Sequence, residues 1–382
     1  MEISALFSKI DSLYPEYVKV WEDICRLESP TADKVAVDRV GEYLTAMATK
    51  RGWKVEVCRQ EKSGDALCFT LNPDVDASPV TMSGHIDTVY PIGYFPAPLV
   101  HTDSEKIYGP GVTDCKGGVV SSFMAMDALW QLGFKDRPVK LVVQTDEEVG
   151  SLYSDKATIE FMCKCAEGSA AFLNTEGMAN GKAVLLRKGI MRCELTVEGI
   201  EGHSSACPNA ANAIAEAAYK IIELEKMKDI NGLTCNCGVI SGGTTPNTVA
   251  GKCSFYADIR FLTNEELERA KATVERLASQ SVIEGCKTEY KLLYIRPALE
   301  YSEKNFALFD RVNELNEKLG LKKLESVLEP SGSDAAYTSA YGIPTIDNLG
   351  VCGGAIHSKD EFAYLDSLRT SARQLAVIAA YI

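Results

Sequence analysis

The sequence has little histidine, no excess of basic charge and no long apolar run, and each shortage narrows what the protein can do. Its 382 residues include only four histidines, and its 53 acidic side chains outnumber 40 basic ones for a net charge of −13. Nucleic acids and anionic membranes are bound through basic patches, so the charge argues against both partners. The apolar runs fall short of the roughly 20 residues that span a bilayer.

Secretion is also disfavoured by the sequence. Residues 1–11 carry Glu2 and lack the basic and apolar regions of a signal peptide. The 13 cysteines are an odd number, and their two C-x-C pairs do not have the spacing of a zinc knuckle. We therefore expect a cytoplasmic protein whose thiols are reduced and pack as small apolar side chains.

The predicted elements alternate between strands and helices over the first half of the chain, which favours an α/β fold. We expect helices at 3–28, 35–50, 117–132 and 152–166, and strands at 53–59, 66–71, 80–82, 139–144 and 170–173. This alternation predicts a three-layer domain with a mixed, largely parallel sheet.

The order changes near residue 188 to strand, helix, strand, strand, helix, strand, which indicates an inserted α+β (βαββαβ) domain. These elements are expected at 191–198, 208–227, 234–241, 252–262, 264–280 and 287–295, with Thr263 as the cap of the second helix. The α/β pattern returns with helices at 304–319 and 333–341, a strand at 343–348 and a helix from 361. The main domain is thus expected to comprise 1–187 and 297–382, and the inserted domain 188–296.

Histidines and acids that could carry chemistry follow the predicted strands. His85 and Asp87 lie two residues apart at a strand end and so share a face in an extended chain. A metal-bound histidine usually needs a carboxylate behind it, which Asp87 can supply. Asp114 stands in a glycine-rich turn before a helix, where it could instead be a helix cap.

Further acids and the last histidine complete the pattern. Glu147 and Glu148 follow an apolar strand, Glu176 follows the next one, and His357 stands in a glycine-rich loop. An acidic loop can simply be solvated, but ligands of open α/β sheets bind beyond the carboxyl ends of the strands. Two histidines with several carboxylates form a ligand set that suits paired zinc ions.

The chain contains, in this order, the motifs SGHIDTV, GVTDCKGG, TDEEVGS, NTEG, GHSS, GGTTPN with DIR, SGSDAAY and HSKDEF. These motifs and their order resemble those of the M20 family of dizinc metallopeptidases. The resemblance extends over nearly the whole chain and is greatest to the glutamate carboxypeptidase and acetylornithine deacetylase branches. It implies that the main domain is catalytic and that the inserted domain is a lid and a homodimer interface.

The resemblance also implies roles for individual residues. His85 and Glu176 would bind one zinc ion, His357 and Glu148 the other, and Asp114 would bridge them. Glu147 would be the general base for the attacking water, and Asp87 would orient His85. Residues matching substrate-binding positions are His203, Asn247, Arg260, Gly332 and Lys182, of which His203 would stabilise the oxyanion and Arg260 would hold a carboxylate.

The expected function is zinc-dependent hydrolysis of an amide bond next to a free carboxylate, as in a carboxypeptidase or an N-acyl-amino-acid amidohydrolase. Cobalt or manganese could replace zinc, since they compete for similar ligands. The alternatives are a di- or tripeptide aminopeptidase or dipeptidase, an inactive binding protein, and a cysteine hydrolase. The last is disfavoured because no cysteine motif has a histidine beside it.

Overall fold

The computed structural model describes residues 1–178, 181–229 and 232–382, which form two compact units. Unit 1 comprises Met1–Leu185, Tyr301–Leu328 and Ser333–Ile382, and unit 2 comprises Leu186–Glu300 and Glu329–Gly332. The short segment Glu329–Gly332 therefore belongs to unit 2, although the sequence analysis expects it in the main domain. The expected boundaries after residues 187 and 296 stay a proposal.

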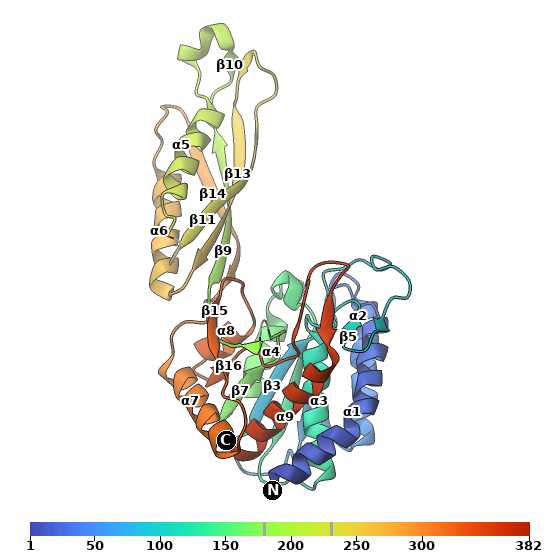
Figure 1. Ribbon diagram of the computed structural model, residues 1–382. Coiled ribbons are helices and arrows are strands. Elements are labelled where there is room, and N and C mark those ends of the chain that lie inside the picture. The colour runs from blue at the N-terminus through green and yellow to red at the C-terminus, as the bar shows by residue number, and fades with distance from the viewer. Residues whose placement is uncertain (179–180, 230–231) are drawn as a thin grey trace. The chain divides into compact units, whose positions relative to one another are not determined.

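The central sheet of unit 1 is mixed and largely parallel, as expected (Figure 1). β3 is parallel to β6 and β7, and β7 is parallel to β16, whereas β2 is antiparallel to both β1 and β6. The strand order is β1 (Lys54–Cys58), β2 (Ala66–Leu71), β6 (Val139–Gln144), β3 (Val80–His85), β7 (Ala171–Asn174) and β16 (Thr345–Ile346).

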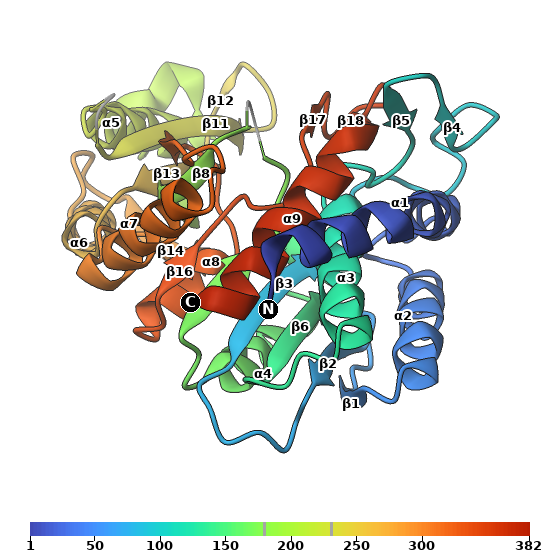
Figure 2. The same ribbon diagram turned by 60° about the horizontal axis from the view of Figure 1, so that its bottom comes forward.

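Helices cover both faces of this sheet. Alternate residues of β2 point to opposite faces: Leu67 and Phe69 join the large core, and Cys68 joins a smaller one. Figure 2 shows α1, α3 and α9 side by side. The large core includes side chains of α1 (Ile3–Arg26), α2 (Lys34–Lys50), α3 (Lys116–Gln131), α7 (Glu303–Lys318) and α9 (Leu365–Tyr381), and the smaller one those of α4 (Ala157–Ala166) and α8 (Ala335–Ala340).

Three helices begin at least four residues later than the sequence suggests. α9 begins at Leu365 rather than 361, because Phe362–Tyr364 form the strand β18. α4 begins at Ala157 rather than 152, because the chain before it forms turns in which Ser151, Asp155 and Lys156 have positive φ. α5 (Ala213–Glu225) begins after Asn212, whose side chain accepts hydrogen bonds from the first turn. The residues before it form a separate 3₁₀ segment, η3 (Ser204–Asn209).

A small antiparallel sheet of unit 1 has no expected counterpart in the sequence. Its order is β17 (Gly353–Gly354), β18 (Phe362–Tyr364), β5 (Lys106–Tyr108) and β4 (His101–Thr102). The pairing of β18 with β5 joins segments about 250 residues apart, with Phe362 opposite Tyr108. This pairing brings the loop that contains His357 next to the turn that contains Asp114.

Unit 2 is an antiparallel sheet with two helices on one face. Its strand order is β11 (Thr234–Gly242), β13 (Lys252–Phe261), β9 (Gly189–Glu198) and β14 (Lys287–Arg296). α5 and α6 (Asn264–Ser279) pack on it around a separate core. The Thr263 cap is confirmed, since its side chain accepts a hydrogen bond from the Glu266 amide.

The described residues also contain shorter strands that pair outside the larger sheets. β10 (Gly202–His203) pairs with β12 (Thr248–Val249) in unit 2. β8 (Ala183–Arg187) pairs with β15 (Ser326–Glu329), and each of these two strands contains a boundary between the units. Within the described residues, no helix combines the length and the apolar character that crossing a membrane requires.

Candidate metal centre

His85 is held in one orientation at the end of β3. Its side chain is only 2% exposed, and its Nδ1 lies 3.0 Å from the backbone oxygen of Asp87 and 3.4 Å from that residue's carboxylate. Since both partners of Nδ1 are acceptors, this nitrogen carries a proton, and Nε2 is the ring nitrogen that a metal ion would bind in place of a proton. The arrangement prepares Nε2 as a metal ligand.

Asp114 lies between the two histidines. Its Oδ1 is 3.0 Å from Nε2 of His85, and its Oδ2 is 3.2 Å from Nε2 of His357. The glycine-rich turn places Asp114 just before α3, but Cys115 is the capping residue and no side chain caps this helix. The alternative role of Asp114 as a helix cap is therefore wrong.

A further carboxylate accompanies each histidine. Glu176, which follows β7, has its Oε1 3.6 Å from Nε2 of His85. Glu148 lies in η1 (Glu147–Val149) after β6, with its Oε2 3.3 Å from Nε2 of His357. Because β3, β6 and β7 are parallel, their carboxyl ends meet at one edge of the sheet. We call the following residues the candidate metal centre: His85, Asp114, Glu148, Glu176 and His357.

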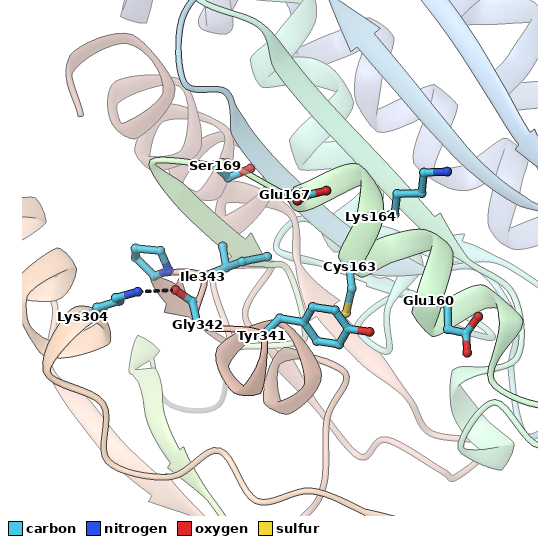
Figure 3. Close-up of a pocket in the computed structure, with 11 residues that line it drawn as sticks. Glu160, Cys163, Lys164, Glu167, Ser169, Lys304, Tyr341, Gly342 and Ile343 are labelled. Carbon is cyan, nitrogen blue, oxygen red and sulfur yellow. Dashed lines mark hydrogen bonds between the residues drawn. The ribbon is translucent and has the colours of Figure 1, made fainter.

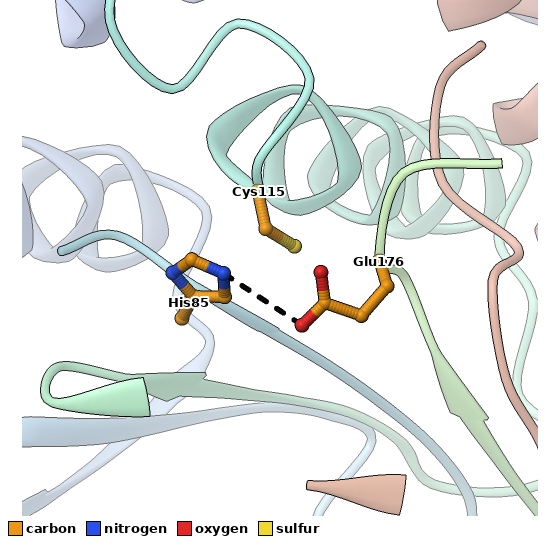
Figure 4. A group of neighbouring side chains, drawn as sticks. All are labelled: His85, Cys115 and Glu176. Atoms are coloured by element: carbon orange, nitrogen blue, oxygen red, sulfur yellow. Dashed lines mark ion pairs between the residues drawn. The ribbon is translucent and has the colours of Figure 1, made fainter. Parts of the chain in front are cut away.

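Cys115 lies next to this centre, and the sequence analysis gives it no role there. Its sulfur and the ligand atoms of His85 and Glu176 lie within 4.8 Å of one another (Figure 4). A second group that could hold a metal ion consists of His85, Asp114 and Glu148. The thiol donates to the backbone oxygen of Thr175 at 3.2 Å, which gives it a structural partner as well. All 13 cysteines lie in the described residues, and each is a free thiol.

The electrostatics of the centre show a shortage of positive charge. Burial opposes ionisation of Asp114, but hydrogen bonds from His357 and His85 outweigh it and lower the pKa of this carboxyl. Burial and the charge of Asp114 raise the pKa of Glu148 to about 8. Hydrogen bonds to Asp114 and Glu148 raise the pKa of His357 to about 10. Such a set of oxygen and nitrogen donors fits divalent cations, which would compensate the buried carboxylates.

Asp87 also supports the acidic loop after β6. Its carboxylate oxygens accept hydrogen bonds from the backbone amides of Glu147 and Glu148, at 3.3 and 3.2 Å, and from the hydroxyl of Thr31 at 2.8 Å. The charge of Glu147 contributes to the raised pKa of Glu176, after burial and the effects of His85 and Asp114. Asp87 thus connects the histidine strand with the loop that carries Glu147.

Two of the expected substrate residues, His203 and Asn247, lie close together in unit 2. His203 is in β10, where its Nδ1 lies 2.8 Å from the hydroxyl of Ser205. The next residue, Ser204, donates its amide to the backbone oxygen of Asn247 at 2.9 Å. The hydroxyl of Thr245 donates to the side-chain oxygen of Asn247, also at 2.9 Å.

Arg260 and Gly332 are both engaged within unit 2. The guanidinium of Arg260 donates to both carboxylate oxygens of Asp258, at 2.6 and 3.3 Å, so it has an ion-pair partner on its own strand. The backbone oxygen of Gly332 accepts from Arg187 at 3.3 Å. A Cβ at Gly332 would lie only 2.7 Å from the side chain of Arg296, which explains why glycine suits this position.

Lys182 belongs to unit 1 and forms an ion pair with Glu325 at 3.0 Å. The two side chains are 38% and 63% exposed. The pair is therefore well solvated, and such pairs contribute little to stability. Among the residues that the structure describes, the contact found for Lys182 is the solvated ion pair of an ordinary surface lysine.

A pocket of about 490 Å³ in unit 1 contains none of the expected site residues (Figure 3). Ser169 precedes β7 and Ile343 precedes β16, so the pocket lies near the amino ends of the parallel strands, whereas His85 lies at a carboxyl end. One of its two lysines, Lys304, donates to the backbone oxygen of Gly342 at 2.9 Å. The pocket and the candidate metal centre are separate features.

Comparison with known proteins adds independent information. A family model described as a peptidase dimerisation domain matches residues 185–286. Carboxypeptidase G2 of Pseudomonas sp. (strain RS-16) is 26% identical over 372 residues, covering 95% of this chain and 88% of that protein. Together these matches support an M20 metallopeptidase. The expectation of an M20 peptidase or amidohydrolase is thereby confirmed.

Solved structures of other proteins share the fold of this chain. Aminopeptidase PepT from Bacillus cereus has a TM-score of 0.77 and 21% identity, and the match covers 95% of this chain and 97% of that one. The Bacillus subtilis YXEP protein, described as a dinuclear metal-binding peptidase from the M20 family, has a TM-score of 0.73 and 15% identity, covering 97% and 98%. These similarities confirm the expected α/β fold with its inserted α+β segment.

Proposed function

We propose that this M20 protein is a hydrolase dependent on two divalent metal ions that cleaves an amide bond next to a free carboxylate. The observation that carries the proposal is the position of Asp114, whose two oxygens face different histidines at 3.0 and 3.2 Å. A carboxylate in that position can be shared by two cations. Each histidine also has a carboxylate of its own nearby, so each cation would have three protein ligands.

We assign one ion to His85 and Glu176 and the other to His357 and Glu148, with Asp114 common to both. Imidazole and carboxylate ligands favour zinc, and cobalt or manganese could take its place. Asp87 keeps the proton of His85 on Nδ1 through its backbone oxygen, which leaves Nε2 for the metal. When bound, the cations would polarise the scissile carbonyl and lower the pKa of a water molecule.

Glu147 is our candidate for the proton carrier. Its carboxylate would accept a proton from the attacking water and return it to the nitrogen of the leaving amine. The backbone of Glu147 is held by Asp87, so the base sits on a supported loop. The interaction between its charge and Glu176 supports a place near the candidate metal centre.

The substrate residues are a further part of this proposal. Arg260 would bind the free carboxylate of a peptide or an N-acyl amino acid by a two-pronged hydrogen bond, and in doing so would compete with its present bond to Asp258. His203 and Asn247 would contact the reacting amide, with His203 stabilising the oxyanion. The backbone of Gly332 would line the site, and Lys182 remains a candidate by resemblance alone.

A homodimer through unit 2 also belongs to this proposal. The family model of a peptidase dimerisation domain matches residues 185–286, most of which belong to unit 2. Tyr219 and Ile222 on α5 are 50% and 56% exposed, and Val239 and Ile240 on the edge strand β11 are 58% and 51% exposed. Large apolar side chains grouped on a helix and an adjoining edge strand are typical of a protein interface. The free thiols fit a cytoplasmic protein.

The test is a turnover screen of the zinc-loaded protein with N-acetyl amino acids, glutamyl amides, dipeptides and succinyl-diaminopimelate. We expect hydrolysis of substrates in which a free carboxylate adjoins the cleaved amide. Cleavage confined to peptides with a free amino terminus would instead support an aminopeptidase or dipeptidase. An intact metal centre without turnover of any of these compounds would support the inactive binding protein.

A further inference from the structure

Glu361 is a buried acid, and both oxygens of its carboxylate accept hydrogen bonds. Its side chain is fully buried. Oε1 accepts from the backbone amides of Thr113 at 2.9 Å and Asp114 at 3.1 Å. Oε2 accepts from the hydroxyl of Tyr90 at 2.8 Å and from the amide of Gly111 at 3.1 Å. A carboxylate has about four acceptor sites, so these four donors satisfy it.

Three of those donors belong to the turn that carries Asp114. The backbone oxygen of Glu361 also accepts from the amide of Gly109 at 3.3 Å, so the same residue holds the start of this turn as well as its end. Gly111 has a φ of +71°, a conformation that a residue with a Cβ seldom adopts. The turn therefore keeps its shape through glycine and through one external acceptor.

Glu361 also lies only four residues after His357. It directly precedes β18, which pairs with β5 and closes the loop that contains His357. His357 itself is in a turn with a φ of +58°. One side chain thus connects the segment of one candidate ligand with the segment of another, and its bond to Tyr90 adds the loop that follows His85 and Asp87.

An acceptor is required at this position. Every partner of the carboxylate is an N–H or an O–H group, so a glutamine there would bring its own N–H₂ donor against at least one of them. The carboxylate of Asp87 is used in the same way, since it accepts from the amides of Glu147 and Glu148. The two acidic segments of the centre are therefore each tied to a buried carboxylate that is not itself among the expected ligands.

We propose that Glu361 is a positioning residue that holds the Asp114 turn and the His357 loop together, so that Asp114 can be shared by two metal ions. It binds no metal and carries no proton in the reaction. This inference rests on the proposed dinuclear site and assigns the residue that keeps its shared ligand in place.

The test compares metal binding by the full chain and by Glu361→Gln. Metal-free protein is titrated with Co²⁺ in a calorimeter, and the visible spectrum of the bound cobalt is recorded. Substitution of groups that orient metal ligands costs about 10- to 100-fold in metal affinity. We expect that loss for one or both ions, an altered cobalt spectrum, and a fall in kcat with little change in KM.

A matched control separates positioning from a general effect on folding. Glu216 in unit 2 is also fully buried, and its carboxylate accepts from the amides of Val282 at 3.0 Å and Ile283 at 2.7 Å. Glu216→Gln should lower the thermal midpoint and leave cobalt affinity unchanged. Two cobalt ions bound by Glu361→Gln with the affinity and spectrum of the parent chain would overturn the proposal, whatever its thermal midpoint.

Milder variants keep the test decisive if Glu361→Gln does not fold. Tyr90→Phe removes a single donor and should weaken cobalt binding by less than Glu361→Gln would, whereas Glu361→Asp keeps the charge and should restore part of the affinity that an uncharged residue loses. Unaltered cobalt binding in both of these variants would overturn the proposal. Failure of the parent chain to bind two ions would instead contradict the proposed function itself.

Discussion

The two histidines of the candidate metal centre face the same carboxylate but are supported differently. The His85 side chain is 2% exposed at the end of a sheet strand, with its Nδ1 bonded to the backbone of Asp87. The His357 side chain is 54% exposed, in a turn with positive φ. The metal position at His85, which we call the inner position, thus lies at the end of a sheet strand. The position at His357, which we call the outer position, depends on a loop that other residues must hold. We infer that the inner ion binds more tightly.

The largest effect on turnover is expected at Glu147, because its proposed role depends on metal ions at both the inner and the outer position. Glu147→Gln removes the proposed proton acceptor and keeps the shape of the side chain. Loss of a general base costs about 10²- to 10⁴-fold, so kcat should fall by that factor. Metal content measured by elemental analysis should remain that of the parent chain. A variant that loses its metal, or that keeps its turnover, would contradict the assignment.

The comparison of the two histidines can be tested directly with alanine variants. In metal-free protein, His85→Ala leaves buried carboxylates without their partner and should reduce the free energy of unfolding by about 1–3 kcal/mol. His357→Ala removes bonds to Asp114 and Glu148, but its half-exposed side chain can be replaced by water, so the reduction should be smaller than for His85→Ala. Urea unfolding of the two variants measures both values.

Metal binding by the same variants sharpens the comparison. His357→Ala should retain one cobalt ion at the inner position, because His85, Asp114 and Glu176 remain. His85→Ala should lose that ion. If the two substitutions had equal effects on stability and on the number of bound ions, the distinction between an inner and an outer position would be wrong.

A smaller effect is expected at Arg260, which acts on substrate rather than on the metal ions. Arg260→Ala should raise KM about tenfold for substrates with a free carboxylate, since a hydrogen bond to a charged group is worth about 1.5–3 kcal/mol and Asp258 already competes for it. Arg192→Ala is the control, because Arg192 donates to the same Asp258 at 2.7 Å. Equal KM values in the two variants would remove Arg260 from the substrate site.

The smallest effect is expected at Lys182. Its ion pair with Glu325 is solvated, so we expect Lys182→Ala to leave both KM and kcat within about twofold of the parent values. Steady-state kinetics with the best substrate of the screen measures this. A large rise in KM would restore the role that the resemblance implies for this lysine.

The sequence predicts well those features that depend on local pattern. The apolar run before His85 predicts its strand, and Thr263 predicts a helix start, because periodicity and capping are properties of neighbouring residues. It does not predict β5 and β18, which are only a few residues long and are stabilised by pairing across about 250 residues.

The candidate site shows the same division between local and distant information. The ligand motifs identify His85, Asp114 and His357, but only the fold reveals which oxygen of Asp114 faces which histidine. Glu361 lies inside the quoted motif HSKDEF, yet its partners at residues 111–114 are not visible from that motif. The nearness of Cys115 to His85 and Glu176 likewise depends on how three separate segments meet.

The most direct test of the account is the number of cobalt ions that the metal-free chain binds in a calorimetric titration, with and without Asp114. We predict two ions per chain, with the inner ion the tighter, and loss of both at the same concentrations in Asp114→Ala. A single ion per chain whose binding survives the removal of Asp114 would contradict the shared ligand on which the proposed function depends.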